Sequence, residues 1–307
     1  MKNKSLLLFV NVIALLTNRA SKKAMTKLFF FLLIIYLFTS CVQFKKVTTS
    51  FNGNCRQLKK YSDYESNSID QQSKYIFESI DLTMLMQVYN LNKLVDEDEL
   101  VTIINLLEWT HKTIPYSYGF SGDKTKTFCN PRNALTMLKN KDDKNIVFVC
   151  RDMATCLTEI YLSLGFKART VTCISRYSND NDVHVVTEVY CNKLNKWIMV
   201  DPSFNAYVIN SNNQILNLYE IRDHFANKLE LKTNSGVNIN NCAFNSNKYL
   251  KYMSRVCFEF ERAIDIEFGI ENISVKRMML IPKGYSKKKH SESEYLQITN
   301  NTDLFWN

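Results

Sequence analysis

One helix followed by three strand-like runs limits the fold of this chain more than any other pattern in it. In residues 150–164 the apolar side chains recur at helical spacing and form one stripe, and Gly165 follows directly as a stop signal. The next three runs are rich in β-branched and aromatic residues, and they lie at 168–174, 183–191 and 196–200. This order predicts an α+β fold in which the helix packs on an antiparallel sheet.

Helical patterns also precede this segment. Apolar residues repeat at helical spacing over 73–94 and 98–114, Pro115 ends the second pattern, and 132–139 forms a third, shorter one. Together with the strands they predict one domain over 76–307, with its core at about 98–210. An apolar content of 46% is enough for a sizeable core.

Charge and cysteine spacing argue against two functional classes. The net charge of +9 is concentrated in residues 1–40, which hold six basic residues and no acid, so only +3 remains for 41–307. No basic stripe of the kind that binds nucleic acid is present. The nine cysteines contain no CxxC pair and the four histidines are scattered, so we expect no structural zinc and no cofactor. Disulfide pairs cannot be assigned from spacing.

The first 40 residues have the pattern of an export signal. Residues 28–38 are an unbroken apolar run of eleven, which is short for a spanning helix of about 20 residues but typical of a signal-peptide core. Thr39 and Ser40 then precede Cys41, and this resembles the lipidation site of bacterial lipoproteins. We therefore expect a signal in 1–40, a lipid anchor on Cys41 and a location in the bacterial cell envelope, facing the periplasm or exterior.

Two features of the N-terminus stay open. Translation could begin at Met1 or at Met25, and the apolar runs 6–16 and 28–38 could instead form a membrane hairpin or an uncleaved anchor. Residues 41–75 are rich in polar side chains and are expected to tether the domain to the membrane.

Cys150 is the candidate nucleophile because it lies in the first turn of the 150–164 helix. The free N–H groups and partial positive charge of a helix N-terminus favour a thiolate, which is the reactive form of cysteine. A buried structural cysteine is the alternative at this stage.

His184 and Asp201 are candidate partners of this thiol. A tight turn at Asn192-Lys193 would place them directly opposite each other on adjacent strands, on the same face and with Cβ atoms about 5 Å apart. A carboxylate beside an imidazole holds its tautomer and stabilises the imidazolium, so His184 could serve as base to Cys150 on the facing helix. Taken singly, each could instead be structural.

The same stretch resembles the transglutaminase-like superfamily, whose core is papain-like. The resemblance rests on Cys150, Ala154, Gly165, Ala168, Arg169, His184, Glu188, Trp197, Asp201 and Pro202. It implies Cys150 as nucleophile, His184 as base and Asp201 as the residue that orients His184. Two positions depart from the pattern: Phe148 stands where Gly is frequent and Val186 where Trp is frequent. Either could reshape the substrate groove.

Other polar residues near this pattern have structural explanations. Arg169 is expected to brace a carboxylate or a strand start, and Asp152 to cap the helix that follows Cys150. Trp109 and His111 are expected in the core, with groove lining or donation to an oxyanion as the alternatives. The backbone N–H of Cys150 is the expected oxyanion donor.

These observations predict a thiol enzyme that attacks a peptide or protein amide, such as a cell-wall peptide, and forms a thioester on Cys150. Water as acceptor would make it a peptidase or amidase, and an amine would make it a transglutaminase. The alternative is a catalytically inactive, envelope-anchored binding module on the same fold.

Overall fold

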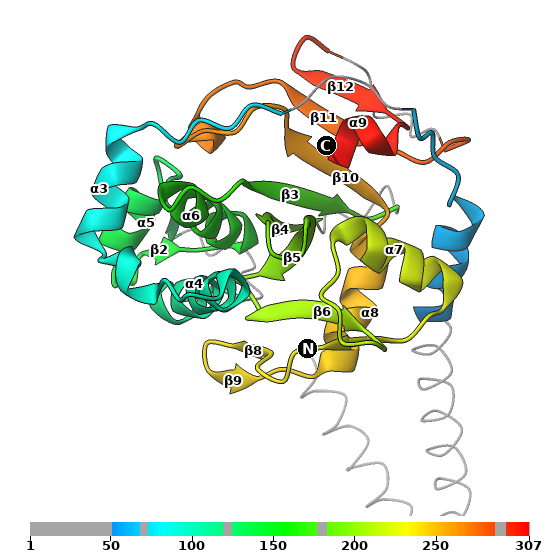
Figure 1. The fold of residues 1–307 in the computed structure, drawn as a ribbon, viewed down its shortest axis with the longest axis horizontal. Helices are drawn as coiled ribbons and strands as arrows, with labels where there is room; N and C mark the ends of the chain where they lie inside the picture. Colours follow the sequence, from blue (N-terminus) through cyan, green and yellow to red (C-terminus); the bar gives the residue numbers. More distant parts are fainter. Residues whose placement is uncertain (1–50, 68–72, 119–124, 177–182, 286–292, 307) are drawn as a thin grey trace, which may run out of the picture. The chain divides into compact units, whose positions relative to one another are not determined.

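An eight-stranded sheet organises the described part of the chain in the computed structural model, which covers residues 51–67, 73–118, 125–176, 183–285 and 293–306 (Figure 1). Its strand order is β12-β11-β10-β3-β4-β5-β6-β7, and every neighbouring pair is antiparallel except β11 with β12. The strands are β3 (Ala168–Ile174), β4 (Val183–Cys191), β5 (Lys196–Asp201), β6 (Ala206–Asn210), β7 (Leu231–Thr233), β10 (Glu259–Ala263), β11 (Arg277–Leu280) and β12 (Leu296–Thr299).

Helices and two short strand pairs complete the fold. Residues 51–60 are helical, and the labelled helices are α3 (Ile80–Val88), η1 (Leu91–Leu94), α4 (Glu99–Thr113), α5 (Ala134–Lys139), α6 (Cys150–Ser163), α7 (Leu218–Asn227), α8 (Ser246–Val256), η2 (Ile270–Asn272) and α9 (Thr302–Trp306). The pairs are β1 (Thr127–Phe128) with β2 (Ile146–Val147), and β8 (Asn238–Ile239) with β9 (Cys242–Ala243). The predicted α+β class and the central helix–strand–strand–strand order are confirmed.

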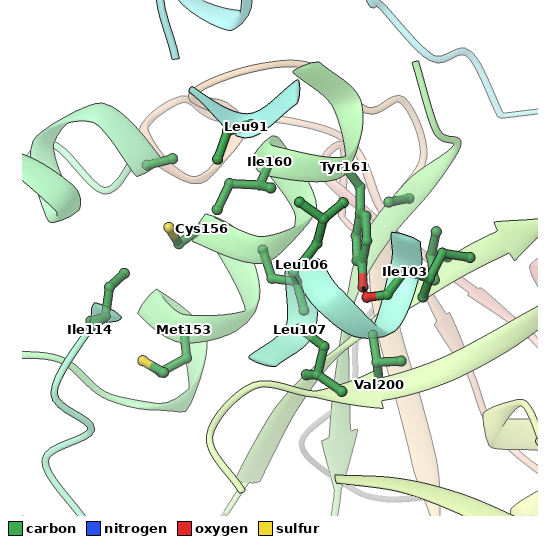
Figure 2. Close-up of a cluster of buried hydrophobic side chains, with 14 of the residues drawn as sticks. Leu91, Ile103, Leu106, Leu107, Ile114, Met153, Cys156, Ile160, Tyr161 and Val200 are labelled. Carbon is green, nitrogen blue, oxygen red and sulfur yellow. Dashed lines mark hydrogen bonds between the residues drawn. The ribbon is translucent and has the colours of Figure 1, made fainter. Parts of the chain in front are cut away.

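The main core lies between α6 and one face of the sheet, with α3, α4 and α5 around the helix (Figure 2). Met153, Leu157 and Ile160 of α6 are fully buried, as their apolar spacing predicts. The hydroxyl of Tyr161 donates to the Ile103 carbonyl at 2.8 Å, so the one polar group that this side chain buries is satisfied. Leu106 of α4 packs in the same cluster.

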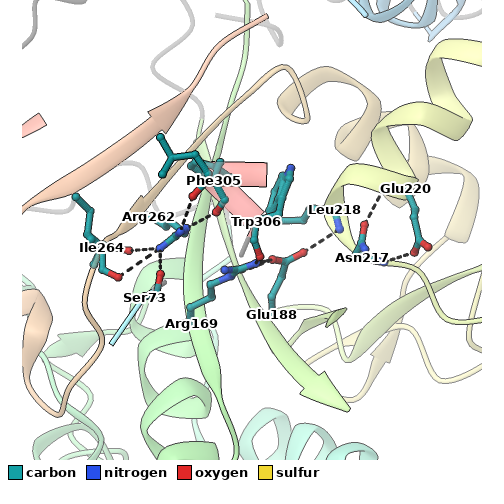
Figure 3. Close-up of polar contacts among 12 residues, drawn as sticks. Ser73, Arg169, Glu188, Asn217, Leu218, Glu220, Arg262, Ile264, Phe305 and Trp306 are labelled. Carbon is teal, nitrogen blue, oxygen red and sulfur yellow. Dashed lines mark hydrogen bonds and ion pairs between the residues drawn. The ribbon is translucent and has the colours of Figure 1, made fainter. Parts of the chain in front are cut away.

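Late-chain helices meet the opposite face of β4, as Figure 3 shows for its polar contacts. Thr187 of β4 donates to the Ala154 carbonyl of α6, whereas its neighbour Glu188 bonds to Arg169 and to the backbone N–H of Leu218 at the start of α7. Because side chains alternate along a strand, odd-numbered residues of β4 face α6 and even-numbered residues face α7, α8 and α9.

The first predicted helix is shorter than expected. α3 begins only at Ile80, because the Ser79 hydroxyl accepts from the N–H groups of Asp81 and Leu82 and caps the helix there. Upstream of it, Tyr75 forms an isolated parallel bridge with Ile266, so the chain is extended at that point.

The expected boundary of the folded domain at residue 76 lies too late. The compact unit that contains the sheet begins at Asn54. Asn54 donates to the Ser254 hydroxyl at 3.2 Å, Leu58 is 1% exposed, and Tyr61 packs edge-on against Phe258 and Tyr285. These contacts bury apolar surface that a solvated tether would expose, so at least residues 54–61 belong to the domain.

The predicted signal, the Cys41 lipidation site and the start of the tether lie outside the described residues. Within the described ranges, no helix has the length and apolar content needed to cross a bilayer.

Candidate active site

Cys150 is the first residue of α6, as predicted, and its side chain is partly exposed. The fully buried Asp152 closes this helix start: its Oδ2 accepts from the N–H of Val149 at 2.8 Å, and its Oδ1 is 2.6 Å from Nε of Arg132. The predicted capping role of Asp152 is thereby confirmed. The cap fixes the helix end from which Cys150 projects.

His184 and Asp201 are in contact, but not in the register that the sequence suggested. Nε2 of His184 is 2.6 Å from Oδ2 of Asp201, and both side chains are buried. Thr187 pairs with Val200, so the strands are shifted by two residues from the predicted pairing and His184 lies diagonally from Asp201. A two-residue shift keeps both side chains on one face, which is why the contact survives.

That face is the one opposite α6, yet the His184 side chain still hydrogen-bonds to the thiol at the start of this helix. His184 and Cys150 can come into contact because the β4–β5 pairing ends at Thr187 and Val200. Past this point the N–H of Val185 hydrogen-bonds to the Cys150 sulfur, and the His184 side chain hydrogen-bonds to the same thiol. The thiol therefore lies beside the edge of β4, beyond the last β4–β5 pair.

The pKa shifts of the pair favour a thiolate and an imidazolium. Burial raises the pKa of Cys150, but its hydrogen bond to His184, the charge of that imidazolium and the Val185 N–H together lower it below the ordinary value. Burial lowers the pKa of His184, but the Asp201 carboxylate and the Cys150 thiolate outweigh it and raise the pKa to about 10. Both shifts favour the charged form of the group concerned.

Asp201 has two further donors that the sequence did not reveal. The Tyr249 hydroxyl donates to Oδ2 at 3.0 Å, and the backbone N–H of Ser203 donates to Oδ1 at 3.0 Å. Asp201 and Tyr249 are fully buried. Tyr249 lies on α8, 48 residues from Asp201, and no local sequence signal could place it there. These bonds fix the carboxylate that holds His184.

Aromatic rings enclose the imidazole, whereas Cys150 is partly exposed. The His184 ring packs edge-on against Phe204 at 5.6 Å and Tyr252 at 5.3 Å between centroids, and it is 1% exposed. Cys150 is therefore the member of the three that solvent reaches. Enclosure of this kind strengthens the ion pair by excluding water.

The other polar residues singled out from the sequence have structural contacts. Arg169 forms a buried ion pair with Glu188 at 3.0 Å, stacks on Trp197 at 3.9 Å and donates to the Trp306 carbonyl at 2.9 Å (Figure 3). His111 bonds to the Pro202 carbonyl at 2.8 Å and is buried. These contacts confirm the structural explanations.

Trp109 is confirmed as a residue packed against the core. The two departures from the family pattern, Phe148 and Val186, are both fully buried. They therefore fill the interior and do not line an open groove. No group of three or more His, Cys, Asp or Glu side chains in the described ranges is placed to hold a metal.

Comparison with known proteins gives one family. Residues 91–202 match the transglutaminase-like superfamily, and this range contains Cys150, His184 and Asp201. No curated protein matches the chain. A crystal structure of a candidate cysteine protease from Cytophaga hutchinsonii aligns at 16% identity with a TM-score of 0.28, over 60% of this chain and 63% of that one. This chain thus spans under two thirds of that structure. Residues 91–202, which carry the Cys–His–Asp contacts described above, are thus similar to the transglutaminase-like superfamily, and this match covers about a third of the chain.

Proposed function

We propose that the protein is a thiol acyltransferase or hydrolase that attacks a peptide or protein amide through Cys150. The observation that supports this most directly is the buried His184–Asp201 pair, 2.6 Å apart, hydrogen-bonded to a thiol at a helix N-terminus. A nucleophile, its base and the group that orients the base are the parts that amide attack by a cysteine requires.

In the first step the Cys150 thiolate attacks the amide carbonyl carbon, and the C–N bond breaks as a thioester forms. The N–H of Cys150, at the free end of α6, is the proposed donor to the oxyanion. His184 gives its proton to the departing amine. The thiolate contributes to the raised pKa of His184, so its conversion to a neutral thioester makes the imidazolium a stronger acid when the amine needs a proton.

In the second step neutral His184 takes a proton from the acceptor, which attacks the thioester and restores the ion pair. Water as acceptor releases a carboxylic acid, and a primary amine yields a new amide. We favour hydrolysis, because no feature of the site marks an amine acceptor.

Acyl-enzyme formation tests the proposal without knowledge of the natural substrate. The full chain in detergent is incubated with an activated ester, such as a p-nitrophenyl ester, and intact mass with peptide mapping locates the acyl group. We expect acylation at Cys150 that is lost in Cys150→Ser and strongly slowed in His184→Ala. Acylation spread over several cysteines, or unchanged in His184→Ala, would favour the inactive binding module.

The choice of acceptor is measured separately. A glutamine-containing protein is offered with a fluorescent primary amine, while ammonia release is followed in parallel. Ammonia release without dye incorporation identifies hydrolysis, and incorporation that depends on Cys150 identifies transfer.

We also propose that Cys41 carries a lipid that anchors the protein in the cell envelope of a bacterium. The support is the apolar run followed by Thr39, Ser40 and Cys41. Metabolic labelling with an alkyne fatty acid should tag the wild type and not Cys41→Ala; equal labelling of both would refute the anchor.

A further inference from the structure

Two buried cysteines lie next to the candidate site and take no part in the proposed chemistry. Cys173 is on β3, directly opposite His184 in the β3–β4 pairing, and Cys257 ends α8. Both side chains are fully buried and both thiols are free.

The topology brings these two cysteines together from positions far apart in the chain. Cys257 is followed closely by β10, which pairs with β3 so that Phe260 lies opposite Cys173. Cys173 shares the face of β3 and β4 that carries His184 and therefore points toward α8. The side chains of Cys173 and Cys257 hydrogen-bond to each other.

Two other cysteines among the described residues bond to oxygen atoms instead. Cys129 donates to the Pro131 carbonyl at 3.9 Å, and Cys191 donates to Glu99 at 3.5 Å. Direct contact between two thiols is what a disulfide requires, since cysteines whose side chains point apart cannot be joined without moving the backbone.

We propose that Cys173 and Cys257 form a disulfide when the chain folds in the presence of an external disulfide. One thiolate attacks the external disulfide, forms a mixed disulfide and releases one thiolate. The second cysteine, after losing its proton to solvent, attacks the sulfur of the first and releases the other thiolate. Two protein thiols are oxidised and one external disulfide is reduced to two thiols.

The reaction belongs to folding rather than to the finished protein. Burial raises the pKa of Cys173 well above the ordinary value, so the native thiol is protonated and unreactive. The bond would join β3 to the end of α8, the helix that presents the Tyr249 hydroxyl to Asp201. It would close a loop from 173 to 257, and long loops gain most from such closure.

The test refolds the denatured, reduced full chain in detergent, with a mixture of reduced and oxidised glutathione. Free thiols are blocked with N-ethylmaleimide, the protein is digested without reduction, and linked peptides are identified by mass spectrometry. Cys150→Ala in parallel keeps the reactive thiol out of the exchange. Thermal melting compares the oxidised and reduced forms.

We expect a peptide that links Cys173 to Cys257, and a melting temperature higher by roughly 10 °C in the oxidised form. Cys55 and Cys191, which are also buried, serve as internal controls and should be blocked by the maleimide. Cys257→Ser should abolish both the linked peptide and the melting gain. Maleimide on both Cys173 and Cys257, or linkage of either to another cysteine, would overturn the proposal. Because no acyl donor is used, either result is independent of the proposed activity.

Discussion

Replacement of His184 by Ala should raise the pKa of Cys150 and make its thiol less reactive near neutral pH. His184 supplies the hydrogen bond and the positive charge that hold the thiol pKa down against burial. A thiol with the ordinary pKa of about 8.5 is only about 0.3% ionised at pH 6. A thiol fully ionised at that pH would hold roughly 300 times more thiolate.

The ratio of the measured alkylation rates should be smaller than this ratio of thiolate concentrations, because a thiolate of lower pKa is a weaker nucleophile. We therefore expect the wild type to react with iodoacetamide at pH 6 about 10 to 100 times faster than His184→Ala. The rate is followed by peptide mass spectrometry of Cys150 between pH 5 and 9. The wild-type rate should rise at a lower pH than the variant rate, because His184 lowers the pKa of the wild-type thiol.

A matched control separates this effect from general loosening of the fold. His224→Ala removes another partly buried histidine, whose Nδ1 bonds to the Glu220 carbonyl on α7, and it should leave the Cys150 profile unchanged. Equal profiles for the wild type and His184→Ala, both rising only near pH 8.5, would refute the thiolate–imidazolium pair.

Three further predictions concern stability, each measured by urea unfolding. Tyr249→Phe should lower the free energy of unfolding by about 1.5–3 kcal/mol, because its hydroxyl bonds to a charged group. The matched Tyr161→Phe loses a bond to a neutral carbonyl and should lower it by only about 1 kcal/mol. Equal losses in the two variants would contradict this. Arg169→Met should cost about 3–5 kcal/mol, because Glu188 is left buried without its ion-pair partner, and a loss below about 1 kcal/mol would refute the argument. Burial raises the pKa of Glu159 to about 8, so the folded state holds this proton more tightly than the unfolded state. The protonated Glu159 therefore contributes its full share to the free energy of unfolding below about pH 4.3, and this share is lost as the pH rises to about 8. Glu159→Gln should flatten this part of the stability curve, and an unchanged slope would argue against it.

Local patterns in the sequence predicted the elements best. β3 and β4 begin and end where the alternation of side chains placed them, and α6 ends within one residue of its predicted end. These elements are long and periodic, so their type is fixed by which side chains must be buried. That Cys150, His184 and Asp201 lie together could be predicted because helix position and strand parity depend only on nearby residues.

The turn between β4 and β5 shows where local reasoning fails. The loop holds four residues, 192–195, and Asn195 takes a positive φ of 49°. Asn tolerates this left-handed conformation, which lengthens the turn and shifts the strands by two residues. After such a shift each side chain still lies on the predicted face of the sheet, but the residue directly opposite it on the next strand is a different one. The contacts of Tyr249 and α9 could not be predicted from the sequence, because they join segments that are distant in the chain.

The position of α9 bears on when the sheet can complete its hydrogen bonds during synthesis of the chain. Arg169 donates to the Trp306 carbonyl, and Arg262 donates to the Phe305 carbonyl at 2.6 Å. Both arginines are interior to the sheet that carries His184. A nascent chain that has not yet released residues 302–306 from the ribosome holds two guanidinium groups without these acceptors. Residues 302–306 must therefore leave the ribosome before Arg169 and Arg262 can reach these carbonyls, so this part of the sheet completes its hydrogen bonds only after α9 has emerged.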